Sequence, residues 1–131
     1  EKYPANSQQE NIFFIGRHPH QLLFQHCAAI VHHGGAGTTH SASLCGKPSV
    51  VIPFMDEQLF WAKALQQLGL AGKPLLARKA NERQLAARIK TILSNETYLR
   101  NAERVGADIR AKNGVNNAVD LIEQTFMSNS N

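Results

Sequence analysis

Residues 32–39 carry the strongest chemical signal of the chain, because two histidines, three glycines and two threonines follow a short apolar run there. Glycines let backbone N–H groups approach a ligand closely, and a helix that begins here offers its unpartnered first N–H groups and the positive end of its dipole. This pattern predicts a phosphate cradle. We expect the hydroxyls of Thr38 and Thr39 and the ring of His33 to donate to phosphate oxygens. The alternative is a turn that only lets a strand meet a helix closely.

Residues 53–58 follow the next apolar run and carry polar groups suited to a sugar. The carboxylates of Asp56 and Glu57 accept hydrogen bonds from hydroxyls, and the amide of Gln58 both donates and accepts them. Ligands of parallel sheets bind beyond the carboxyl ends of the strands, so these side chains should face the same crevice as the glycine segment. For Asp56 the alternative is a helix N-cap without a ligand.

Two other phosphate motifs can be compared with this region. A P-loop is excluded, because Pro48 follows Gly-Lys where Ser or Thr is required. The dinucleotide fingerprint matches at Gly35 and Gly37 but has His40 at its third glycine, with an acidic pair at 56–57 about 20 residues later. A dinucleotide-binding oxidoreductase fragment therefore stays open as an alternative.

The histidines and cysteines indicate no metal site and no disulfide framework. The six histidines fit no zinc signature, and we expect no metal or other cofactor. Cys27 and Cys45 are typical of reduced thiols in a cytoplasmic protein.

Length and composition predict a single domain over residues 1–131. With 43% hydrophobic and 18% charged residues, the chain has enough apolar material for a core, which argues against disorder. A formal charge of +4 suits a phosphate-bearing ligand and is too small to argue for nucleic acid. No apolar run approaches the roughly 18–20 residues of a membrane span.

Strands and helices are expected to alternate in the first part of the chain. Short β-rich apolar runs predict buried strands over 11–16, 28–31 and 49–53, and a fourth, edge-like strand over 73–76, with a loop before them at 1–11. Helices are expected over 19–26, about 38–45 (ending at Gly46) and 57–68 (ending at Gly69).

The rest of the chain has helical patterns only. Asn81 is a suitable N-cap, with Gln84 three residues later. Apolar stripes then run over 85–93, 99–109 and 115–126, before a tail at 127–131. Together the elements predict an α/β fold with a Rossmann-like parallel sheet, flanking helices and a helical C-terminal third. Four strands are few for this fold, so we expect a small sheet or further strands before Glu1.

The segments at 32–39, 46–48 and 53–58 resemble the donor-binding signature of nucleotide-sugar glycosyltransferases. The sterol 3-β-glucosyltransferase-like and bacterial natural-product members are the most similar, and the similarity covers about residues 11–76. The resemblance implies the GT-B fold, in which two Rossmann-like halves face each other across the active site. This chain matches the later part of the C-terminal, donor-binding half.

Site roles follow from this resemblance by position. His33 would contact the donor phosphates, with Gly35, Gly37 and Thr38 beside it. Glu57 and Gln58 match the Asp-Gln pair that holds the sugar hydroxyls in the family, and Asp56 adjoins them.

The resemblance also implies which residues lie near the base and the ribose of the donor. His18 falls where the family's backbone pairs with the uracil edge. Arg17 replaces the base-stacking Trp of plant members, and His20 replaces their Gln. Ser41 stands where they place a ribose-binding Glu.

The activity that the resemblance implies is transfer of a hexose, glucose in the first instance, from a UDP-sugar to a hydroxyl of a hydrophobic acceptor such as a sterol or lipid. Transfer inverts the anomeric carbon and needs no metal. The general base is a histidine of the N-terminal half, so no residue here is expected to be catalytic. The expected location is cytoplasmic, with peripheral membrane association and self-association as open possibilities; a non-catalytic nucleotide-sugar-binding subunit is the other alternative.

Overall fold

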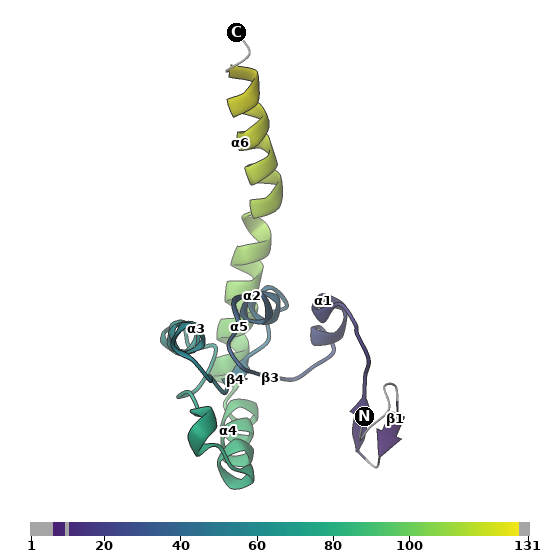
Figure 1. Ribbon diagram of the computed structural model, residues 1–131, viewed down its shortest axis with the longest axis vertical. Helices are drawn as coiled ribbons and strands as arrows, with labels where there is room; N and C mark the ends of the chain where they lie inside the picture. The colour runs from purple at the N-terminus through teal and green to yellow at the C-terminus, as the bar shows by residue number, and fades with distance from the viewer. Residues whose placement is uncertain (1–6, 10, 129–131) are drawn as a thin grey trace.

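The computed structural model describes residues 7–9 and 11–128. Two short strands come first, β1 (Ser7–Gln9) and β2 (Ile12–Phe14), followed by a βαβ unit and then helices. The elements after β2 are α1 (His20–Phe24), β3 (Ile30–His32), α2 (Ala36–Leu44), β4 (Ser49–Val51), α3 (Asp56–Gln67), the 3-10 turn η1 (Ala77–Lys79), α4 (Glu82–Ser94), α5 (Glu96–Ala111) and α6 (Gly114–Ser128). The fold is mixed α/β and mostly helical, with a small parallel sheet (Figure 1).

Strands β3 and β4 form the parallel sheet that the sequence predicts. Ile30 lies opposite Ser49, and His32 lies opposite Val51. Helix α2 connects the two strands and packs against β3, while α4 packs against β4. Because the strands are parallel, the segments that leave their carboxyl ends emerge at the same edge of the sheet.

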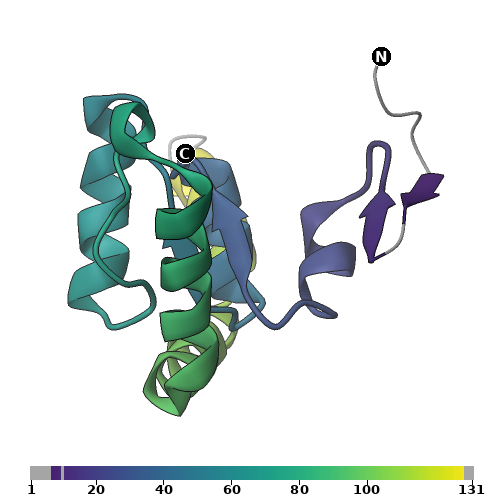
Figure 2. The same ribbon diagram turned by 90° about the horizontal axis from the view of Figure 1, so that it is seen from below.

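The apolar run at 11–16 was expected to be a buried strand of this sheet, and that expectation is wrong. Strand β2 pairs antiparallel with β1, with Phe13 opposite Gln8, and the Phe13 side chain is 56% exposed. The hairpin stands apart from the helical body, as Figure 1 and Figure 2 both show. Strand β1 is only a few residues from β2 in the chain, so their pairing costs little loop-closure entropy, which favours the hairpin. Residues 7–9 were expected to be loop, whereas 1–6 and 10 lie outside the described residues.

The fourth strand, expected at 73–76, does not form. The chain still follows β4, since Ala71 bridges to Ser49 and the N–H of Leu75 donates to the carbonyl of Val51 at 3.0 Å. Pro74 has no N–H to donate, which prevents a continuous ladder there.

The helix boundaries agree with the sequence signals to within about two residues. Gly46 and Gly69 follow α2 and α3 with positive φ angles of 65° and 69°. Asn81 caps α4, because its Oδ1 accepts from the N–H of Gln84 at 2.9 Å. Helix α2 begins at Ala36, slightly before the expected start.

Helix α5 supports α2 from behind by a close backbone contact. A Cβ on Gly106 would lie 2.8 Å from the carbonyl oxygen of Ser43, so only glycine allows this approach. Ala102, one turn earlier, is fully buried. At the end of α2 the Arg110 guanidinium donates to the carbonyl of Leu44. Helix α5 therefore determines how α2 sits against the sheet.

Helix α6 extends beyond the helical body, in line with α5 (Figure 1). The expected apolar stripe at 115–126 is helical, but it is uncovered: Val115 and Phe126 are 79% and 71% exposed. Among the described residues, no helix combines the length and apolar character needed to cross a membrane.

The Gly106 contact gives a test of how α2 is held. We expect Gly106→Ala to lower the free energy of unfolding by about 1–3 kcal/mol, because the new methyl group forces the α2–α5 backbones apart. Gly114→Ala is the matched control, since a Cβ there meets no atom within 4 Å. Chemical denaturation of both variants measures the difference. Equal stability of the two variants would show that α5 does not constrain α2.

Candidate functional site

The N-terminus of α2 is open to an anion. Its N-cap, Gly35, has no side chain to cap the helix, and the first turn contains no acidic residue. The first bond is from the N–H of Thr39 to the carbonyl of Gly35, at 2.9 Å. Within the described part of the chain, no acceptor is found for the N–H groups of Ala36, Gly37 and Thr38. These donors and the helix dipole are the groups that an anion cradle needs, and binding of phosphate here stays a prediction.

Gly34 connects this cradle to β4 and α3. Its φ of 94° lies in the left-handed region, and a Cβ there would be 2.8 Å from the carbonyl oxygen of Gln58 and 2.9 Å from Val51 Cγ1. No other residue type satisfies both constraints without displacement. The segment between β3 and α2 therefore touches the first turn of α3, which carries the side chains predicted to bind the sugar.

The other two glycines have different surroundings. A Cβ on Gly35 would lie 2.5 Å from Nε2 of His33, so the exposed His33 ring lies directly beside the start of α2. A Cβ on Gly37 would meet no atom within 4 Å, so this glycine borders open space. The site thus presents a histidine ring and free backbone donors next to an unobstructed approach.

The first turn of α3 carries the predicted sugar-binding side chains. The N-cap is Met55 and not Asp56, so the capping alternative for Asp56 is wrong. Asp56 and Glu57 are exposed in the first turn, where carboxylates are stabilised by the helix dipole. Gln58 is half-buried, and its Oε1 accepts from the N–H of Phe54 at 2.8 Å. Its amide NH₂ remains as a donor.

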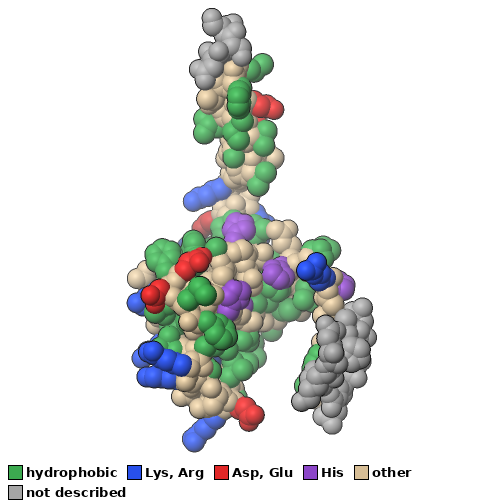
Figure 3. All heavy atoms as spheres, viewed as in Figure 1, with side chains coloured by type: hydrophobic (Ala, Val, Ile, Leu, Met, Phe, Trp, Pro, Cys, Tyr) green, Lys and Arg blue, Asp and Glu red, His purple; other side chains and the backbone are tan. Residues whose placement is uncertain are grey.

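The predicted base-binding residues line an open pocket of about 730 Å³. Arg17 and His18 come from the segment before α1, His20 is the first residue of α1, and Thr38 of α2 lines the same pocket. His18 Nδ1 lies 3.3 Å from the carbonyl of Gly16, and the His20 ring stacks on Phe24 at 4.8 Å. Several histidine side chains lie near one another on the face seen in Figure 3.

His32 also lines this pocket, although it was not expected to belong to the site. It is only 8% exposed, its Nδ1 accepts from the N–H of Gly34 at 3.1 Å, and its Nε2 has no partner among the described residues. Burial, and secondarily the charge of neighbouring His33, lowers the pKa of His32 from 6.5 to about 4. Strand alternation could have indicated it, because residue 32 shares the buried face of Ile30.

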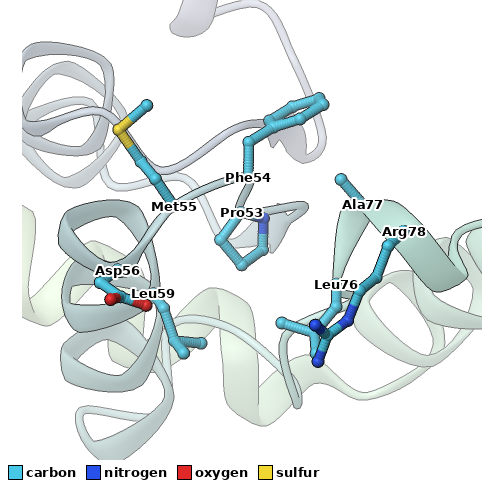
Figure 4. Close-up of a pocket in the computed structure, with 8 residues that line it drawn as sticks. All are labelled: Pro53, Phe54, Met55, Asp56, Leu59, Leu76, Ala77 and Arg78. Carbon is cyan, nitrogen blue, oxygen red and sulfur yellow. The ribbon is translucent and has the colours of Figure 1, made fainter.

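Asp56 lines a second, smaller pocket of about 180 Å³ that contains none of the glycine-segment residues. Pro53 lies between the start of α3 and the η1 segment, with Asp56 and Arg78 on opposite sides (Figure 4). Backbone pairing joins the two sides, since the N–H of Ala77 donates to the carbonyl of Pro53 at 3.2 Å. Sequence patterns gave no signal for Arg78.

The described residues contain no group of three or more histidine, cysteine or acidic side chains placed to hold a metal ion. The site consists instead of backbone donors, imidazole rings and the polar side chains at the start of α3. Such groups suit a ligand that has both an anionic part and hydroxyls.

A family model, the C-terminal domain of erythromycin biosynthesis protein CIII-like proteins, matches residues 4–124. The chain belongs to this family. It is 38% identical over 102 residues to O-mycaminosyltylonolide 6-deoxyallosyltransferase of Streptomyces fradiae, covering 78% of this chain and 24% of the relative. It is 34% identical over 115 residues to a sterol 3-beta-glucosyltransferase of Komagataella phaffii, covering 88% of this chain and 9% of the relative.

Solved structures agree with this membership. The crystal structure of the glycosyltransferase of kitacinnamycin matches with a TM-score of 0.79 and 24% identity, over 88% of this chain and 30% of that one. The chain is thus a C-terminal, donor-binding domain of the GT-B glycosyltransferase type, spanning less than a third of each relative. The oxidoreductase alternative is not supported.

The lowered pKa of His32 predicts a loss of stability in mild acid. The unfolded chain binds a proton on this ring below pH 6.5, whereas the folded chain does so only near pH 4. The free energy of unfolding should therefore fall as the pH is lowered through this window, by on the order of 3 kcal/mol in total. Denaturant titrations from pH 7.5 to 4 measure it. His32→Asn is the control, because it does not titrate; an equal pH dependence in both proteins would contradict the assignment.

Proposed function

We propose that this domain binds the UDP-sugar donor of an inverting glycosyltransferase that transfers glucose to a hydroxyl of a hydrophobic acceptor, such as a sterol or lipid. The observation that carries the proposal is the contact at Gly34, which joins a cradle of unpaired N–H groups to the first turn of α3. A nucleotide sugar has a diphosphate and a hydroxyl-bearing ring next to each other, and these two segments match that order.

The diphosphate would lie at the start of α2. Free N–H groups of the first turn, the hydroxyl of Thr38 and the ring of His33 would donate to its oxygens, and the open space beside Gly37 would admit them. The nucleoside would occupy the larger pocket, between the segment of Arg17, His18 and His20 and the end of β3.

The sugar would contact the first turn of α3. Gln58 uses its Oε1 for the backbone of Phe54, so its NH₂ would donate to a sugar hydroxyl. Glu57, next to it and exposed, would accept from another hydroxyl. Asp56 lines the smaller pocket and would bound the sugar site from that side.

In the proposed reaction the acceptor oxygen attacks the anomeric carbon while the bond from that carbon to the diphosphate oxygen breaks. Negative charge grows on the departing UDP, where the α2 donors stabilise it without a metal ion. The acceptor proton passes to a base, a histidine that we assign to another part of the enzyme, together with the acceptor pocket. We propose a cytoplasmic location with peripheral membrane contact to reach the acceptor.

Ligand binding by the chain itself tests the proposal. We expect UDP-glucose to raise the melting temperature more than NADH does, because NADH has a diphosphate but no hexose for the first turn of α3. A radiolabelled transfer assay with a sterol acceptor, run beside a full-length relative, should show no turnover by the 131-residue chain. Stabilisation by NADH alone would overturn the ligand class, and turnover would overturn the assignment of the base.

His33→Ala should weaken UDP binding by about 1–3 kcal/mol, since it removes one hydrogen bond to phosphate. Isothermal titration calorimetry measures the loss. His26→Ala is the matched control, because His26 is exposed and lines neither site pocket. Unchanged UDP affinity in His33→Ala would give this ring a purely structural role.

Gln58→Ala should weaken UDP-glucose binding and leave UDP binding unchanged, because the residue is assigned to the sugar alone. Truncation also removes the acceptor for Phe54, so Gln58→Glu separates the two effects: it keeps an oxygen for the Phe54 N–H and removes the amide donor. Calorimetric affinities for both ligands are compared in each variant. An equal loss for UDP and UDP-glucose would contradict the assignment.

A further inference from the structure

We propose that His32 is a positioning residue: through Gly34 it holds the segment that leads into α2, residues 33–38, in the conformation that would bind the diphosphate. The inference rests on the proposed function only in taking UDP as the ligand. His32 itself would not touch the diphosphate; its Nδ1 would fix the peptide that precedes the cradle.

The contacts around Gly34 support this role. Its N–H donates to His32 Nδ1 at 3.1 Å, its φ is 94°, and its Cα lies against the Gln58 carbonyl and the Val51 side chain. Gly34 is buried, so its N–H would have no alternative partner in solvent. The next residue, Gly35, is the N-cap of α2. A rotation of the peptide between His33 and Gly34 would therefore move both the His33 ring and the first turn of α2.

The tautomer of His32 follows from the same contact. Because Nδ1 accepts the Gly34 N–H, it carries no proton, and the proton of the neutral ring lies on Nε2. Nε2 is buried and has no partner among the described residues. A leucine would avoid the cost of this unpaired donor. The hydrogen bond that the His32 ring contributes is therefore made by Nδ1, as an acceptor, and not by the Nε2 proton.

Three substitutions distinguish the role of Nδ1 of His32 from that of Nε2. Asparagine places an oxygen near the position of Nδ1, glutamine places an amide near Nε2, and leucine offers neither. We expect His32→Asn to bind UDP within about twofold of the unchanged chain, and His32→Gln and His32→Leu to bind about tenfold more weakly, the loss of one net hydrogen bond. His26→Asn, at an exposed histidine outside both pockets, is the matched control.

Calorimetry with UDP and melting temperatures without ligand are measured on each variant. Recovery by Asn but not Gln, at similar melting temperatures, supports the positioning role, because a residue that only fills the core would not distinguish them. Recovery by Gln but not Asn would overturn it and assign Nε2 to the ligand. Equal affinities in all three variants would also overturn it.

A measurement on the unchanged chain keeps the inference testable if the variants do not fold. Nitrogen spectra of the labelled histidine rings should show an unprotonated Nδ1 at His32, and the Gly34 amide should exchange slowly with solvent. A proton on Nδ1, or rapid exchange at Gly34, would overturn the inference. If the unchanged chain does not bind UDP while this spectrum is as expected, the proposed function fails and the His32–Gly34 interaction stands.

Discussion

The geometry of the site depends on the absence of a side chain at Gly34. Three elements approach this position: β3 ends just before it, and both Val51 of β4 and the Gln58 carbonyl in the first turn of α3 lie where its side chain would be. The left-handed φ and the lack of space both require glycine. With this packing in place, the backbone continues through Gly35 into α2, so the cradle and the polar turn of α3 share one anchoring point. Their relative position is a property of the backbone and not of flexible side chains.

Glycine also appears on the opposite side of α2, where Gly106 of α5 lets the two helices touch backbone to backbone. Helix α2 thus packs against both the sheet, through β3, and helix α5. Such rigid support suits a binding site built from main-chain N–H groups, because these groups have no rotamers with which to adapt to a ligand. In the proposed reaction, this rigidity would hold the departing UDP in one position.

Local signals in the sequence predicted the helices well, whereas the roles of the predicted site residues stay predictions. Gly46, Gly69 and Asn81 end or begin helices where expected, because each acts through its own backbone or cap. The errors concern long-range pairing: the run at 12–14 found its partner in a nearby polar strand, and Pro74 interrupted the fourth strand. His32 was missed for a related reason. Its neighbour His33 has the same side chain, and only the alternation along β3 distinguishes the buried ring from the exposed one.

Arg110 of α5 places a positive charge at the C-terminus of α2. The last turn of α2 has no basic residue of its own, and the guanidinium of Arg110 from α5 donates to its final residue, Leu44. A cation there offsets the negative pole of the helix, which spans only about 13 Å over its nine residues. Because Arg110 cancels part of the negative pole at the C-terminus of α2, the positive potential at the N-terminus of α2 is less opposed. Part of the electrostatic attraction that an anion would feel at the start of α2 therefore comes from Arg110 of α5, a helix that lines neither site pocket.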